Sequence, residues 1–104
     1  MEQRRSRRFA LHLPVSITRS GTEHIMQSGL TKNISSGGVL FTAGKEPDIG
    51  VCIEYVISLG GPSDQMVSLR CIGKVVRANR SASGESDYDV AATLERYEFV
   101  RREG

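Results

Sequence analysis

Two groups of residues before residue 40 have the types and spacing expected of an anion-binding site. The first lies near the N-terminus, where Arg4 and Arg8 are separated by three residues and two further arginines accompany them. A guanidinium group is planar and always charged, so it can pair with phosphate oxygens, hydrogen-bond to the O6/N7 edge of guanine or stack on an aromatic face. The second group is residues 33–38, NISSGG, which combine an amide, two hydroxyls and two glycines. The arginines favour a ligand that carries phosphate or guanine.

The charge of the chain is unevenly distributed. The net charge is +2, but residues 1–8 carry +3 and the remaining 96 residues carry −1. A nearly neutral body argues against a protein that coats nucleic acid, because such proteins present a basic face or stripe. The anion should therefore be small and should meet the N-terminal segment. The alternative is that this segment is a solvated basic tail that aids solubility or touches membrane lipids.

Alternating apolar and polar residues predict that both groups are carried by a β scaffold. From Leu11 to Ile17 every second residue is apolar, which is the pattern of a strand with one buried face. Further strands are expected at residues 24–34, 39–42, 51–59, 66–76 and 88–94. Six short strands separated by turn residues, without a long helical pattern, predict an all-β fold. We expect a small six-stranded antiparallel barrel, with a sandwich as the alternative architecture.

The expected organisation is one domain preceded by a flexible arm. Residues 1–9 are too rich in arginine to bury enough surface to order themselves, and residues 10–104 form the barrel domain. Within the barrel, Pro14 suggests an edge position or a bulge, and Gly73 suggests a bulge or bend that helps the barrel to close. Residues 97–104 are expected to be a solvated end, either extended or a frayed helical turn.

No catalytic or metal-binding motif is recognisable. Cys52 and Cys71 lie 19 positions apart without a second pair, and we expect two half-buried thiols. His12 and His24 each stand alone and are expected at the surface or at strand edges. No nucleophile motif or pair of acids is evident, so we expect no enzyme, no metal and no cofactor. The apolar stretches are far shorter than a membrane-spanning helix and no secretory signal is visible, so we expect a cytoplasmic protein without a transmembrane segment.

The order and setting of the two groups resemble the PilZ family. In that family an RxxxR arm and a (D/N)xSxxG segment on a six-stranded barrel jointly bind cyclic di-GMP. The resemblance covers nearly the whole chain, because the residues at 13–15, 39–41 and 90–92 also look like family sequence. Either motif alone has low specificity, whereas the two in this order on a β scaffold are fairly specific.

A second copy of the Asn/Ser/Gly pattern occurs at residues 79–84, NRSASG. Context separates the two copies. After Gly38 the apolar residues 39–41 follow, so the first copy enters a buried strand, as in the family. The second copy has Arg80 in place of the apolar Ile34 and is followed by polar residues, and we interpret it as a hydrophilic turn.

The resemblance implies a set of ligand-binding residues: Arg4, Arg8, Asn33, Ser35 and Gly38, with Arg5, Arg7 and Gly37 in secondary roles. Its implied ligand has two guanines and a charge near −2, which the paired arginines can neutralise while stacking on or hydrogen-bonding to guanine. Asn33 can bind the guanine edge but lacks the charge of the aspartate form of the motif. The hydroxyl of Ser35 suits phosphate or a base edge, and the glycines allow a tight turn close to the ligand.

The function implied by the resemblance is a binding switch. The arm would be mobile without ligand, would order over the barrel mouth when cyclic di-GMP binds, and would then present a new surface to a protein partner. That partner is not identified by the sequence, and a homodimer is possible. Two alternatives stay open: a ligand-independent protein-interaction barrel, and a basic β-barrel that binds single-stranded nucleic acid. Six aromatic residues, no tryptophan and a body charge of −1 argue against the latter.

Overall fold

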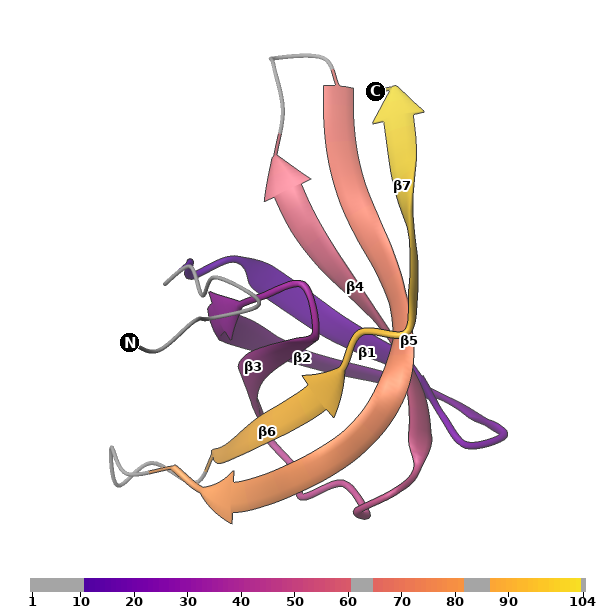
Figure 1. Ribbon diagram of the computed structural model, residues 1–104. Helices are drawn as coiled ribbons and strands as arrows, with labels where there is room; N and C mark the ends of the chain where they lie inside the picture. Colours follow the sequence, from indigo (N-terminus) through magenta and orange to yellow (C-terminus); the bar gives the residue numbers. More distant parts are fainter. Residues whose placement is uncertain (1–10, 61–64, 82–86, 104) are drawn as a thin grey trace, which may run out of the picture.

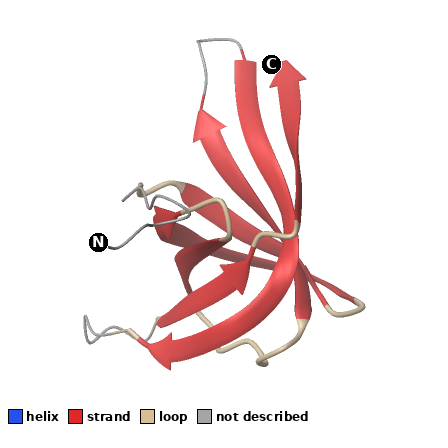
Figure 2. Cartoon of the chain, viewed as in Figure 1, coloured by secondary structure: helices blue, strands red, loops and turns tan. Residues whose placement is uncertain are grey.

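Every secondary-structure element of the computed structural model is a β-strand within the residues that it describes, which are 11–60, 65–81 and 87–103 (Figure 2). The strands are β1 (Pro14–Ser20), β2 (Glu23–Ile34), β3 (Gly38–Ala43), β4 (Cys52–Gly60), β5 (Gln65–Arg80), β6 (Tyr88–Thr93) and β7 (Arg96–Glu103). All their pairings are antiparallel. The all-β prediction is therefore confirmed.

Six of the strands close into a barrel. The order across the sheet is β4-β1-β2-β3-β6-β5-β7, and an additional pairing of β4 with β5 joins the two sides (Figure 1). The first half of β5 pairs with β4 and β7, and its second half pairs with β6. The upper part of β4, β5 and β7 therefore forms a three-stranded extension that projects from the barrel in Figure 1. The predicted six-stranded barrel is confirmed, with one strand more than predicted.

Alternating side chains of each strand fill the barrel core. In β4, Ile53, Tyr55 and Ile57 are buried while the residues between them are partly exposed. The ring of Phe41 in β3 stacks on that of Tyr55, with the ring centroids 5.5 Å apart. Full burial of one such apolar side chain contributes about 1.5–3 kcal/mol relative to exposure. This core holds the strands in the register that places the candidate site.

Gly73 lies where β5 changes partners. A Cβ atom at this position would lie 2.6 Å from the carbonyl carbon of Thr93 and would overlap its oxygen, so only glycine allows the backbones to approach this closely. The register of β5 against β6 shifts between Val75 and Arg77, directly after this contact. The bend predicted at Gly73 is thus present, and it turns β5 from the extension into the barrel wall.

The expectation that Pro14 marks an edge strand is wrong. β1 pairs with β2 on one side and with β4 on the other, so it has no free edge. Pro14 is the first residue of the strand, a position that tolerates the missing amide hydrogen. The irregularity in β1 lies between Ile17 and Arg19 instead.

The C-terminal residues form β7, so the extended alternative is right and the frayed helical turn is wrong. β7 pairs with β5 without a register shift from Arg96 opposite Ile72 to Glu103 opposite Gln65. Every residue from 96 to 101 is exposed, which explains why no buried face is evident in the sequence. β5 also continues to Arg80, four residues beyond the predicted end.

The two cysteines differ in burial, so the expectation that both are half-buried is wrong. Cys71 is fully buried in the core, whereas Cys52 is exposed, and neither forms a disulfide. His12 and His24 are exposed, as expected. Among the described residues, no group of three His, Cys, Asp or Glu side chains could hold a metal ion. No helix in this part of the chain is long and apolar enough to cross a membrane.

Candidate functional site

The Asn/Ser/Gly segment lines one shallow pocket on the barrel wall. The pocket has a volume of about 250 Å³ and is bounded by the end of β2, the β2–β3 turn, β3, β5 and β6. Its lining residues are Asn33, Ser35, Gly37, Gly38, Val39, Leu40, Val76, Arg77, Ala91, Ala92 and Thr93. The structure thus brings together all four site residues that the sequence placed in this segment.

Ser35 determines the shape of the β2–β3 turn. Its backbone amide donates to the carbonyl of Gly38 over 2.9 Å, and its hydroxyl donates to the same carbonyl over 3.3 Å. The hydroxyl oxygen also accepts a hydrogen bond of 3.4 Å from the amide of Gly37. Because its proton is used within the turn, the Ser35 hydroxyl offers an approaching ligand an acceptor rather than a donor.

The two glycines serve different purposes. Neither has a positive φ, so the turn does not need the left-handed conformation. A Cβ atom at Gly38 would lie 2.8 Å from the carbonyl oxygen of Ala92, and this close approach of β3 to β6 requires glycine. A Cβ atom at Gly37 would meet no atom within 4 Å, so the space above Gly37 is open. The steric role expected next to a ligand therefore fits Gly37, whereas Gly38 is needed for strand packing.

Asn33 lies at the rim of the pocket, partly buried and opposite Leu40 of β3. The register of β2 against β3 shifts between Thr31 and Asn33, which is an irregularity of the kind that redirects a side chain. Within the described part of the chain, the amide side chain of Asn33 has no hydrogen-bond partner. Its donor and acceptor atoms are therefore available to a ligand.

Arg77 is a site residue that the sequence analysis missed. It lies in the second half of β5, is exposed and lines the same pocket as Asn33. It forms no ion pair with any described residue. The proximity arises because β6 pairs with both β3 and β5, and no local pattern around residue 77 could have indicated it. Arg77 supplies the pocket with a positive charge.

The predicted arginines Arg4, Arg5, Arg7 and Arg8 lie outside the described residues. The described chain starts beside the pocket, because Leu11 and Leu13 are fixed to Thr31 of β2. The hydroxyl of this fully buried threonine donates to the Leu11 carbonyl and accepts from the Leu13 amide over 2.9 Å. Thr31 precedes Asn33 by two residues on β2, so the first described residues lie near the pocket.

The second copy of the motif lies at the opposite end of β6. Gly38 of the first copy pairs with Thr93, whereas Arg80 of the second pairs with Tyr88. The guanidinium of Arg80 lies 5.8 Å from the centroid of the Tyr88 ring. Residues 82–84 of this copy fall outside the described part of the chain. The two copies cannot share one pocket, since five residues of an extended strand separate them by roughly 17 Å.

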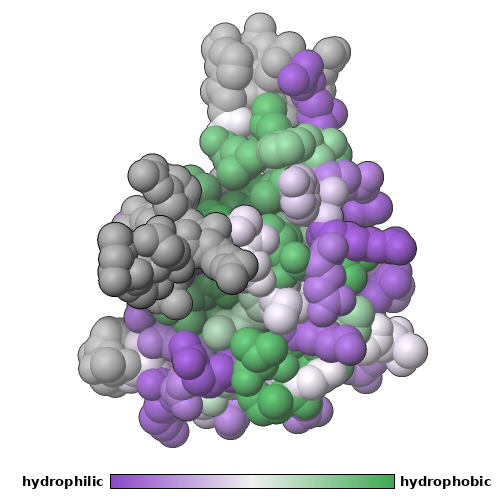
Figure 3. Space-filling view, viewed as in Figure 1, coloured by the Kyte–Doolittle hydropathy of each residue, from purple (hydrophilic) through white to green (hydrophobic). Residues whose placement is uncertain are grey.

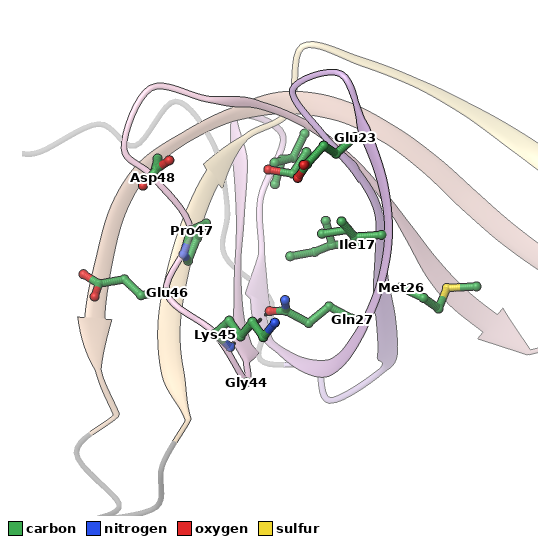
Figure 4. A pocket seen from close by; sticks show the side chains of 12 residues that line it. Ile17, Glu23, Met26, Gln27, Gly44, Lys45, Glu46, Pro47 and Asp48 are labelled. Atoms are coloured by element: carbon green, nitrogen blue, oxygen red, sulfur yellow. Dashed lines mark hydrogen bonds between the residues drawn. The ribbon is translucent and has the colours of Figure 1, made fainter.

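A larger cavity, of about 650 Å³, lies elsewhere and contains none of the predicted site residues. Ile17, Glu23 and Gln27 extend from one side of it, and the β3–β4 connection around residues 44–48 forms the other (Figure 4). The carboxylates of Glu23, Glu46 and Asp48 outnumber the single ammonium group of Lys45. A dianion would be repelled here, so the smaller pocket with Arg77 is the better candidate for an anion.

Comparisons with known proteins identify the family and the fold of this chain. The family model described as PilZ domain matches residues 2–97. The structure of the Bacillus subtilis inhibitor of motility MotI/DgrA is similar, with a TM-score of 0.71 and 19% sequence identity over 94% of this chain. At this identity the likeness concerns the fold. The chain spans 45% of the length of that protein. A comparison with curated proteins found no match.

The family match covers the RxxxR segment, the Asn/Ser/Gly segment and all six barrel strands. PilZ domains are binding and regulatory domains rather than enzymes. Since the match extends over far more than half of its residues, the chain belongs to the PilZ domain family.

Proposed function

We propose that this chain is a cyclic di-GMP-binding signalling domain whose N-terminal arm orders over the Asn33–Gly38 pocket when the ligand binds. The observation that carries the proposal is the convergence of Asn33, Ser35, Gly37 and Arg77 on one pocket next to the start of the arm. Family membership supports the choice of ligand. The domain would act in the cytoplasm and pass its ligand-bound state to a protein partner.

The arm is long enough to bring its arginines to the pocket. An extended chain spans at most about 3.3–3.6 Å per residue. Arg8 is three residues from Leu11, so its Cα lies within about 11 Å of the fixed position beside Thr31, and Arg4 lies within about 25 Å. A guanidinium group adds several ångströms to this reach. Both charges can therefore meet a ligand seated at Asn33.

Each side chain of the pocket and the arm binds the group of the ligand that matches its hydrogen-bonding chemistry. Arg4, Arg8 and Arg77 neutralise the two phosphates or hydrogen-bond to guanine through charge-assisted hydrogen bonds. The Ser35 hydroxyl accepts from a guanine N–H, because its own proton is held by the Gly38 carbonyl. Asn33 both donates and accepts along the same base edge. The open space above Gly37 leaves room for the base.

The arginine roles are tested by isothermal titration of the purified protein with cyclic di-GMP at moderate salt. A hydrogen bond to a charged group contributes about 1.5–3 kcal/mol, so Arg4→Ala, Arg8→Ala and Arg77→Ala should each lower the affinity by about 10- to 100-fold. Arg80→Ala is the matched control, because Arg80 lies on the same strand as Arg77 but at the far end of β6. Its affinity should equal that of the wild type. No heat with the wild type would favour the ligand-independent interaction barrel instead.

The two copies of the motif are distinguished by their serines. Ser35→Ala should weaken binding, and Ser81→Ala should leave it unchanged. Because Ser35 also shapes the β2–β3 turn, the urea midpoint of each variant is measured alongside the titration. A loss of affinity in Ser81→Ala alone would mean that the second copy of the motif, residues 79–84, forms the site.

A further inference from the structure

β7 has an open edge. Among the described strands it is the one with a single neighbour, since β5 pairs with it on one side and nothing described pairs on the other. It is eight residues long, contains no proline and has no register shift. Proteins commonly protect such edges with short strands, prolines, bulges or charged side chains, and of these β7 has only the charges. A regular edge of this kind is open to another strand whose charges complement its own.

One face of the extension around β7 is apolar. Tyr97 is 61% exposed and Phe99 is 67% exposed, and their rings meet edge to face with centroids 6.3 Å apart. Tyr97 is opposite Cys71 of β5 and Phe99 is opposite Leu69, so all four point to the same side of the sheet. Figure 3 shows hydrophobic side chains gathered over this part of the molecule. The face continues up to the open edge.

The opposite face carries a row of alternating charges that ends at the same edge. Arg70 of β5 lies 3.8 Å from the Glu54 carboxylate of β4 and 2.8 Å from the Glu98 carboxylate of β7. The order across the three strands is negative, positive, negative. A positive residue beyond Glu98 would continue this alternation.

We propose that β7 pairs antiparallel with β7 of a second copy of this chain, about a twofold axis at Val100. In such a pairing, residues equally far from the axis face each other, and Glu98 then lies opposite Arg102 of the other copy. This pair occurs twice by symmetry and continues the row that starts at Glu54. On the apolar face, Phe99 lies opposite Arg101, a cation and a ring that attract each other.

The charges of β7 favour this register over its neighbours. An axis at Phe99 would place Arg96 opposite Arg102 twice. An axis at Glu98 or at Arg101 would place that residue opposite its own copy, with like charges in contact. Like charges directly opposite each other on a sheet are destabilising. The axis at Val100 alone among these four combines unlike pairs with no like pair.

The pairing should be weak and dependent on concentration. Stable protein interfaces bury about 800 Å² per partner, and two paired eight-residue strands bury less than that. The expected observation is therefore a monomer–dimer equilibrium rather than a permanent dimer.

Sedimentation equilibrium over a wide range of protein concentration, without cyclic di-GMP, tests the proposal. Val100 meets its own copy at the axis, so Val100→Lys and Val100→Glu should each raise the dimer dissociation constant by about tenfold or more. An equimolar mixture of the two variants should dimerise at least as well as the wild type, because lysine then faces glutamate. Val100 is 39% exposed, which lets the monomer accept either side chain.

Ile49→Lys is the control, because Ile49 is 60% exposed and lies in the β3–β4 connection, away from β7. It should dimerise like the wild type. A wild type that is monomeric at every concentration overturns the proposal. The proposal is also overturned if the two Val100 variants fail to associate when mixed although each retains the urea midpoint of the wild type. The titration with cyclic di-GMP is independent of these results, so failure of one proposal is distinguishable from failure of the other.

Discussion

Tyr55 and Cys71 place two weakly acidic groups inside the barrel core. Tyr55 is fully buried, and its hydroxyl donates to the carbonyl of Thr93 over 2.9 Å. Burial raises the pKa of Tyr55 well above its usual value, and the neighbouring Cys71 and Glu95 raise it further. Burial alone raises the pKa of Cys71 from 9.0 to about 12. Both groups are therefore held in their neutral forms, and ionisation of either opposes folding.

This arrangement predicts that the protein loses stability in alkaline solution. A group whose pKa is higher in the folded than in the unfolded state binds more protons when the protein is folded. Its contribution to the free energy of unfolding is complete below the unfolded pKa and is lost as the pH rises through the folded pKa. For Cys71 the loss starts near pH 9 and continues to about pH 12. Over this window the free energy of unfolding should fall by up to about 1.4 kcal/mol per pH unit for each group.

Urea unfolding measured below and above pH 9 tests this dependence. Cys71→Ala should be less stable than the wild type at neutral pH, because it leaves a cavity, but its stability should fall less steeply with pH. Tyr55→Phe should also flatten the dependence, while costing about 1 kcal/mol for the lost hydrogen bond to Thr93. An alkaline slope that is the same in both variants as in the wild type would contradict the assignment to these two residues.

The barrel strands depend on glycine where β5 bends toward β6. Gly73→Ala should destabilise the protein by roughly 4 kcal/mol or more, because the new methyl group overlaps the Thr93 carbonyl. This carbonyl cannot easily move away, since it accepts a hydrogen bond from Tyr55 and Thr93 is paired with β3. Urea unfolding followed by circular dichroism measures the change. Gly44→Ala is the control, since a Cβ atom there meets nothing within 4 Å and no positive φ is required. Equal stability of the two variants would mean that the strands can separate at Gly73 without cost.

The strands that the sequence predicts best are those with one buried face. Period-two alternation predicted the six barrel strands, including β4, because Ile53, Tyr55 and Ile57 face one core. β7 was not predicted as a strand because it packs no side chain into that core, so its sequence lacks the alternation of buried and exposed residues. The strands could be predicted from the sequence because they bury one face against a shared core, and not because of strand propensity.

The candidate site was predicted in part for a similar reason. Asn33, Ser35, Gly37 and Gly38 lie within one six-residue segment, so their spacing can be recognised in the sequence. Arg77 joins them through two strand pairings, and no property of residues 70–80 indicates that contact. Gly38 was assigned to the ligand and does line the pocket, and the structure adds a packing requirement, because a Cβ atom there would lie 2.8 Å from the carbonyl oxygen of Ala92. Contacts that depend on the order of strands in the sheet could therefore not be predicted from the sequence.

At the scale of the whole molecule, charge is unevenly divided along the chain and between the two pockets. Residues 1–8 carry +3 and the remaining 96 residues carry −1, and Arg77 is the charged residue among the described residues that line the smaller pocket. The larger cavity carries an excess of carboxylates instead. We therefore expect a dianion to favour the smaller pocket over the larger one.

This charge distribution predicts that the affinity for cyclic di-GMP falls as salt rises. The Debye length shrinks from about 30 Å at 0.01 M to about 3 Å at 1 M ionic strength, so the attraction between the arm and the phosphates is progressively screened. The dissociation constant should rise by about tenfold or more over this range, and Arg8→Ala should show a shallower dependence because one of the screened charges is gone. Isothermal titration at several salt concentrations measures both slopes. Arg80→Ala, whose charge lies at the other end of β6, should retain the wild-type slope. Binding that is independent of salt would mean that the arginines do not hold the phosphates, and the arm would then have to act through stacking on guanine alone.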